Sequence, residues 1–504
     1  MNIPIEIVDH ISTYITERGH QASVALINKA WNSSMTPMLY RDIDISEASH
    51  SRARFRETGE LPQMCGVTRT LANFHIDSQT ESRQRQKWEM TIMRIRRYLQ
   101  EILDRNGFPR VSKLEMFSPD VEIADILLKG LLPQIRHLQI TSPFLKYLEF
   151  NTEGNLGFRN LGELELGFSQ DIFHSSNEPM FSSAKIARHR VDQHMYSRFN
   201  NFFSRCPSLQ MLRIDGTKDL HRLLQSVTFP CLRALEIGPV LNHQVDFAII
   251  CLNSFLDRHP GVSRLALRNL PNETSHKLRL SGAARRNMRE FISSIEEVPS
   301  DYSMLLKQFQ GLETYRLEHH VIVGEVLHTE LLNLLPELQF NSPGIKRLTL
   351  PMPSHISGWA LTERKMETAR VALMEFGQAL SEFLPTVEEF GICQTGRFSD
   401  LEAADWARSL ASHTSLRHIA IKSSFLPINE SDGIRQDLIN QLALEFAAIP
   451  GLESFVFFES MDQQAIKVEI IRIDDGRVEG RETLVEVEQV NKVFFDEFFD
   501  SGGW

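Results

Sequence analysis

The fold is decided by a repeated phrase whose clearest copy is Arg258-His259-Pro260-Gly261-Val262-Ser263-Arg264-Leu265-Ala266-Leu267. An apolar run ending in Phe255-Leu256 precedes it with spacing that suits a helix. Proline lacks an amide proton and disfavours helical geometry in the residue before it, so the helix ends at Pro260. Leu265 and Leu267 are separated by one residue, which places both on one face of a short strand. The phrase therefore predicts one helix followed by one strand.

The same three-anchor pattern returns eleven times along the chain, at intervals of 23 to 50 residues. Each copy has an apolar residue, a gap of two, a second apolar residue, a gap of one, and a third. The copies are Val111-Leu114-Met116, Ile135-Leu138-Ile140, Leu161-Leu164-Leu166, Leu209-Leu212-Ile214, Leu232-Leu235-Ile237, Val262-Leu265-Leu267, Leu312-Tyr315-Leu317, Ile345-Leu348-Leu350, Val387-Phe390-Ile392, Leu416-Ile419-Ile421 and Leu452-Phe455-Phe457.

One such unit cannot fold alone. Burying its three anchors contributes about 1.5–3 kcal/mol each, whereas ordering a thirty-residue backbone costs on the order of 30–60 kcal/mol. Neighbouring units supply the missing stabilisation, because they bury both faces of each layer. The pattern resembles irregular leucine-rich repeats. The resemblance implies an α/β solenoid over 111–460, a horseshoe with a parallel concave sheet and convex helices.

Composition indicates an ordinary soluble globular chain. The 504 residues are 42% hydrophobic and 24% charged, and the net charge of −11 gives no overall attraction to nucleic acid or anionic membranes. Five scattered cysteines without a Cys-x-x-Cys pair are expected to be reduced. No secretory signal or membrane-length apolar run is present, so we expect a cytoplasmic or nuclear protein.

Residues 1–45 form a separate predicted module of three short helices, too small to be stable without a partner. Its sequence runs through Ile3-Pro4-Ile5-Glu6-Ile7-Val8-Asp9-His10-Ile11, Ala25-Leu26-Ile27-Asn28-Lys29-Ala30-Trp31 and Thr36-Pro37-Met38-Leu39-Tyr40-Arg41-Asp42-Ile43. This segment resembles a fungal-type F-box. The resemblance implies docking on a Skp-type adaptor, and through it on a cullin, by Ile3, Pro4, Ile7, Ile11, Ile27 and Trp31. A self-contained cap on the repeat array is the alternative.

The segments that flank the repeats are expected to differ from them. Residues 46–110 are predicted as a linker and a basic amphipathic helix, since nine Lys or Arg and three Asp or Glu lie between Arg83 and Lys113. Without interleaved aromatics, a solvated helix face explains that charge better than a surface that binds an acidic substrate or nucleic acid. Residues 461–504 are predicted as a hairpin cap, turning at Asp474-Asp475-Gly476, followed by an acidic aromatic tail.

Recognition is expected on the residues that alternate with the strand anchors. Their charges are mixed in the first two-thirds of the array, and their side chains become smaller toward its end. The candidate substrate-binding residues are Arg213, Arg264, Arg316 and Arg347. One hypothesis is that they bind a phosphate group on the substrate. A solvated face without a ligand is the alternative for each. Two long intervals, 170–201 and 270–300, are predicted as loop insertions or extra helices.

The sequence carries no nucleotide-binding, hydrolase or metalloprotease motif. No catalytic residue, cofactor or metal is expected, and the histidines of 170–201 lack a metal-ligand spacing. The function that the F-box resemblance implies is a non-catalytic substrate receptor of a Skp–cullin–F-box ubiquitin ligase, with an unidentified protein substrate. A repeat scaffold outside any ligase is one alternative, and a hydrolase hidden in the long intervals is another.

Overall fold

A computed structural model gives the fold for part of the chain. It describes residues 23–24, 42–44, 70–72, 96–97, 100, 103–104, 111–117, 126–128, 130–131, 134–141, 158–167, 202–215, 224–225, 227–238, 245–267, 278–295, 306–319, 326–351, 363–393, 403–422, 432–458, 464–473 and 477–486. The chain divides into two compact units, Met1–Arg233 and Ala234–Trp504.

The first unit is built on parallel strands in chain order. Its strands are β1 (Asp42–Asp44), β2 (Thr70–Ala72), β3 (Lys113–Phe117), β4 (His137–Thr141), β5 (Glu163–Gly167) and β6 (Met211–Asp215). Consecutive strands from β1 to β6 pair in parallel. The strand β1 lies within the segment predicted as the N-terminal helical module, so the sheet begins inside that segment.

The second unit is also built on strands in chain order, and helices lie between many of them along the chain. Its strands are β7 (Ala234–Ile237), β8 (Arg264–Leu267), β9 (Glu290–Ile295), β10 (Thr314–His319), β11 (Arg347–Pro351), β12 (Glu389–Cys393), β13 (His418–Lys422) and β14 (Ser454–Phe458). Its helices are α11 (Val245–Arg258), α12 (Gly282–Asn287), α14 (Val326–Asn341), α15 (Glu363–Phe383), α16 (Ala403–Leu410) and α17 (Asp432–Phe446).

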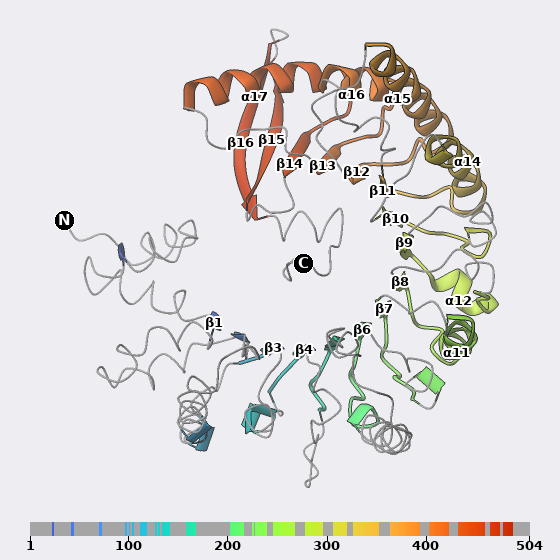
Figure 1. The fold of residues 1–504 in the computed structure, drawn as a ribbon, viewed down its shortest axis with the longest axis vertical. Helices are drawn as coiled ribbons and strands as arrows, with labels where there is room; N and C mark the ends of the chain where they lie inside the picture. The colour runs from blue at the N-terminus through green and yellow to red at the C-terminus, as the bar shows by residue number, and fades with distance from the viewer. Residues whose placement is uncertain are drawn as a thin grey trace, which may run out of the picture. The chain divides into compact units, whose positions relative to one another are not determined.

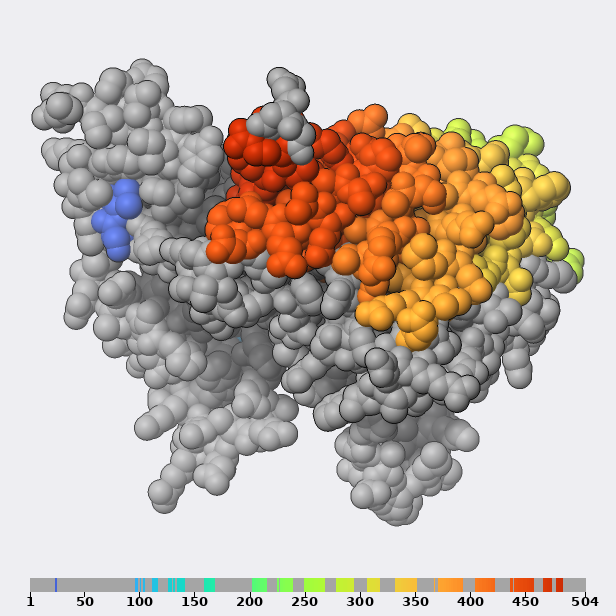
Figure 2. Space-filling model, turned by 90° about the horizontal axis from the view of Figure 1, so that it is seen from above, coloured from blue at the N-terminus to red at the C-terminus, as the bar shows by residue number. Residues whose placement is uncertain are grey.

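Strands β7 to β14 form a parallel sheet in chain order. The helices α14 to α17 lie along one side of it (Figure 1). The space-filling view shows the same order, with colours running from yellow-green to red along the second unit (Figure 2). An α/β array with a mostly parallel sheet was the predicted fold class, and this arrangement is compatible with a repeat solenoid.

The predicted anchors form the core of both units. Each anchor whose side chain is described is at most 3% exposed, from Val111 in the first copy to Phe455 in the last. The parallel register aligns equivalent anchors, for example Leu114 with Leu138 and Phe390 with Ile419. Apolar helix residues such as Phe376 and Phe446 cover them, and Phe446 stacks on Phe455 with ring centroids 4.7 Å apart. The three-anchor pattern was therefore a correct guide to the register.

The interval 270–300, predicted as a loop insertion or extra helices, does contain a helix, but it also contains a strand that the prediction missed. This interval holds a full repeat, with helix α12 followed by strand β9, which pairs with β8 and β10. Its anchors are Met288, Phe291 and Ser293, all fully buried. The search for three apolar anchors missed this copy because its third position is a serine.

A hairpin follows the last parallel strand. Strand β15 (Gln464–Arg472) pairs antiparallel with β14, and β16 (Val478–Glu486) pairs antiparallel with β15. Gly480 allows β16 to approach α17, since an added Cβ would lie 2.9 Å from the Cγ2 atom of Ile439. Residues of the predicted hairpin therefore cover the edge of β14, although its turn, 474–476, lies outside the described residues.

Other predictions fall on residues that the structure does not describe. They include the six predicted adaptor contacts, the interval 170–201, most of the basic helix and the aromatic tail beyond 486. None of the helices in the described ranges has the length and apolar character needed to cross a bilayer.

Two buried histidines lie between a helix and the strand that follows it, and each donates a hydrogen bond to a backbone carbonyl oxygen. His259 Nδ1 lies 2.7 Å from the Phe255 carbonyl oxygen, and His413 Nε2 lies 3.1 Å from that of Leu384. Burial lowers the pKa of both imidazoles, although each backbone contact opposes that shift. Both are therefore neutral in the folded protein at physiological pH.

Replacing Phe390 by alanine should cost about 3–5 kcal/mol of unfolding free energy, because it empties a fully buried core position. The matched control is Phe340→Ala, at a side chain that is 85% exposed, where a change within about 0.5 kcal/mol is expected. Urea titration of both variants measures the difference. Equal losses would contradict the assigned core.

The buried histidines should make stability depend on pH. Their folded pKa lies below the ordinary value of about 6.5, so the unfolded chain binds more protons as pH falls through that value. The unfolding free energy should therefore be fully present above about pH 6.5 and decrease below it. Urea titrations across this range should show a smaller decrease for His413→Gln, which cannot take up the proton. An unchanged pH slope in that variant would refute the assignment.

Candidate interaction surface on the sheet

Two rows of side chains project from the face of each sheet opposite the buried anchors, because they alternate with those anchors along every strand. In the first unit the rows are Lys113, His137, Glu163 and Met211, and Glu115, Gln139, Glu165 and Arg213. In the second unit they are Ala234, Arg264, Glu290, Thr314, Arg347, Glu389, His418 and Ser454, and Glu236, Ala266, Ile292, Arg316, Thr349, Gly391, Ala420 and Val456.

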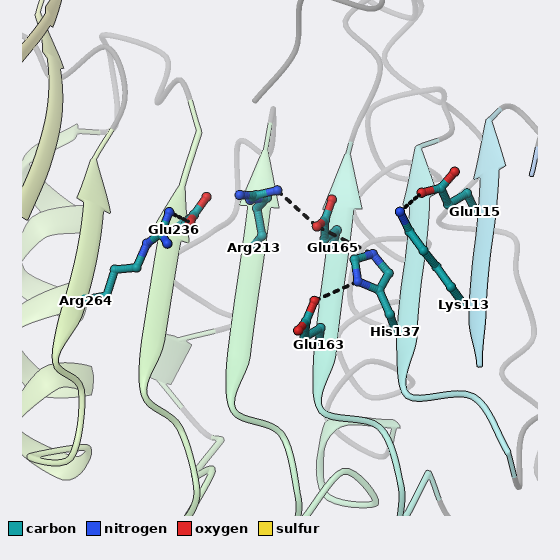
Figure 3. A network of polar contacts seen from close by, with 8 residues as sticks. All are labelled: Lys113, Glu115, His137, Glu163, Glu165, Arg213, Glu236 and Arg264. Carbon is teal, nitrogen blue, oxygen red and sulfur yellow. Dashed lines mark hydrogen bonds and ion pairs between the residues drawn. The ribbon is translucent and has the colours of Figure 1, made fainter. Parts of the chain in front are cut away.

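The first unit carries a polar network centred on His137 and Glu165 (Figure 3). His137 Nδ1 lies 2.8 Å from Glu163 Oε2, and its Nε2 lies 3.6 Å from Glu165 Oε1. Arg213 donates to the same Glu165 oxygen at 3.0 Å. Three adjacent strands are thereby joined through one carboxylate. The ion pair of Lys113 with Glu115 lies beside this network on β3.

The second unit carries a chain of alternating charges across β7 to β10. Arg264 lies 2.9 Å from Glu236, a pair that Figure 3 also shows, and 3.8 Å from Glu290. Glu290 is also 3.3 Å from Arg316. The side chains of Glu236 and Arg316, at the two ends, are only 2% and 4% exposed. Because isolated buried charges are costly, each of these groups depends on its neighbour.

All four candidate arginines have a glutamate partner on an adjacent strand. The structure brings Arg264 and Arg316 together on Glu290, while Arg213 is paired with Glu165 in the first unit. Arg347 is 2.9 Å from Glu389 and, at 51% exposed, is the most accessible of the four. The arrangement is a neutralised mixed-charge face, on which an incoming phosphate would compete with carboxylates already in place.

The far end of the second row is made of small residues. Thr349, Gly391, Ala420 and Val456 occupy it on successive strands, and all four are buried. Gly391 permits close packing here, since an added Cβ would lie 2.7 Å from Thr349 Oγ1. The predicted decrease in side-chain size is thus accompanied by tight contact between neighbouring strands.

Sequence reasoning identified the arginines and missed how they are paired. Glu290 escaped notice because its repeat, with a serine anchor, was not recognised. The signal was nevertheless available, because aligning the repeats places Arg264 directly opposite Glu290. The same alignment puts Glu236 and Arg316 two positions further along the flanking strands, diagonal to residues of opposite charge.

No metal site accompanies these charges in the described ranges, which contain no group of three or more His, Cys, Asp or Glu side chains placed to hold an ion. A scan against protein-family models and a search of curated proteins both find no match to this chain.

Replacing Glu290 by glutamine should cost about 3 kcal/mol of unfolding free energy, because it leaves Arg264 and the buried Arg316 without their shared carboxylate. The matched control is Glu313→Gln, which removes an exposed partner of Arg289 and should cost less than about 1 kcal/mol. Urea titration separates the two outcomes. A cost at Glu290 no larger than that at Glu313 would show that the network does not stabilise the sheet.

Proposed function

We propose that this protein is the substrate-recognition subunit of a Skp–cullin–F-box ubiquitin ligase. In this proposal the F-box-like segment binds the Skp-type adaptor through Ile3, Pro4, Ile7, Ile11, Ile27 and Trp31. The stacked units, interpreted as irregular leucine-rich repeats, bind a protein substrate. The observation that carries the proposal is the pairing of an F-box-like sequence with an array of helix–strand repeats.

The mixed-charge face supports a protein as the ligand of the array. Opposite charges at fixed positions on successive strands favour a partner with a complementary pattern and disfavour one of a single charge sign. Nucleic acid carries uniform negative charge, and the net charge of −11 opposes its approach. The glutamate beside each candidate arginine favours an unmodified protein segment over a phosphorylated one.

The role is non-catalytic and needs no cofactor. A rigid array that holds the substrate near a ubiquitin-carrying enzyme accelerates transfer by raising the effective concentration of the reacting groups. The chemistry then belongs to the other subunits of the ligase. Action in the cytoplasm or nucleus follows from this assignment.

A scaffold that works outside any ligase is the second candidate, since the array alone is sufficient for binding a protein. The two differ in their partners. Affinity purification of the intact chain should recover both adaptor and cullin if it is a ligase subunit. Recovery of the adaptor alone would favour the scaffold.

Replacing Ile7 by aspartate should abolish adaptor capture, because it places a charge in the predicted apolar docking surface. The matched control is Ile250→Asp, at an exposed position of α11, which should leave capture unchanged. Pull-down of the adaptor by the full-length variants measures the effect, with circular dichroism to verify folding. Wild-type capture by the folded Ile7 variant would refute the docking assignment.

A further inference from the structure

A second charged feature lies at the rim of the second unit, where each strand begins. The residue immediately before strands β9 to β14 is charged in every case, and the sign alternates from strand to strand. We name this row the rim ladder. Its members are Arg289, Glu313, Lys346, Glu388, Arg417 and Glu453.

The rim ladder is exposed and regularly spaced. Its side chains are between 43% and 61% exposed, and three lateral pairs form at 3.6, 3.8 and 2.6 Å. In all five steps the amide nitrogen of one member donates to the carbonyl oxygen of the member before it at 2.8 Å. The backbone therefore fixes the charges at the spacing of neighbouring strands, about 4.8 Å.

The rim itself is accessible around these charges. Short turns lead into the strands from α14, α15 and α17, and their prolines Pro343, Pro385 and Pro450 are exposed. The ladder also has two defined ends. Ser263 precedes β8 at its start, and Ile470 of the hairpin donates its amide to the Glu453 carbonyl at its finish.

When an alternating row with an even number of charges is rotated by 180°, each of its charges can face a charge of opposite sign in the original row. A twofold axis passing between Lys346 and Glu388 would place each of these residues opposite the other in a second copy. The same axis would oppose Glu313 to Arg417 and Arg289 to Glu453. The spacing of the charges matches, because both rows have the same strand-to-strand repeat.

We propose that the rim ladder is a self-recognition surface through which two copies of this chain associate about a twofold axis. Docking surrounds each charge with opposite charges, laterally within its own chain and across the interface. The existing lateral pairs keep the row in order before contact, so little side-chain freedom is lost. This inference does not depend on the ligase assignment.

The association should be weak and sensitive to salt. Six strands span only about 24 Å, which is short for a permanent interface, and exposed charges are screened within about 10 Å at 0.1 M salt. We therefore expect dissociation constants in the micromolar range. The ladder would determine which surface pairs and in which orientation, as charge patterns do in other interfaces.

The test is sedimentation of the full-length chain from about 1 to 100 µM at low salt and at about 0.5 M salt. The wild type should self-associate at low salt. Glu388→Lys should weaken association about tenfold or more. In that variant a lysine at position 388 faces Lys346 of the other copy, and the twofold axis repeats this contact between like charges. The double exchange Lys346→Glu with Glu388→Lys should restore association, since opposite charges again face each other.

Mixing the wild type with the double-exchange variant gives the decisive result. Each should associate with itself and reject the other, because like charges meet across the axis at both central positions. The matched control exchanges Lys307 and Glu337, an ion pair 3.8 Å apart that is not part of the rim ladder. That variant should mix freely with the wild type.

Three results would overturn the proposal. A wild-type chain that stays monomeric at every concentration would leave the ladder with a purely intramolecular role. Association that Glu388→Lys does not weaken would place the contact on another surface. Free mixing of the wild type with the double-exchange variant would do the same.

Discussion

The fold depends on lateral pairing of strands that cannot be stable alone. Each strand buries its anchors only because the neighbouring strands and the helices packed on them cover both sides. Parallel pairing in a constant register then brings equivalent positions of every repeat next to one another. Core packing and surface chemistry are therefore set by the same alignment.

The surface networks follow from this register. Since Glu236, Arg264, Glu290 and Arg316 lie on four consecutive strands, opposite charges meet without any side chain having to reach far. The result is two kinds of charge on one unit. Buried pairs on the sheet face contribute to holding the strands together, whereas the exposed pairs of the rim ladder exchange readily with solvent. The second kind is therefore better suited to contact with a second copy of the chain.

The sequence predicted the repeat and its register well, because the anchors are apolar and their spacing is regular. Leu265 and Phe390 needed no further information to be placed in a core. The repeat that contains Ser293 was lost because burial of a serine leaves no hydrophobic signal. Pairing of Arg264 with Glu236 and Glu290 was also missed, since residues far apart in sequence become neighbours only once strand order is known. The residues of the F-box resemblance lie outside the described structure, so that prediction rests on sequence alone.

The antiparallel hairpin at β15 and β16 also determines how the array can change in length. A further repeat would need a parallel strand as its neighbour, and after β14 that place is taken by a strand running the other way. Duplication of a helix–strand unit between existing strands preserves every pairing direction, whereas addition at this end does not. Repeats can therefore be added between existing strands of the second unit, but not after β14, where β15 already pairs in the antiparallel direction.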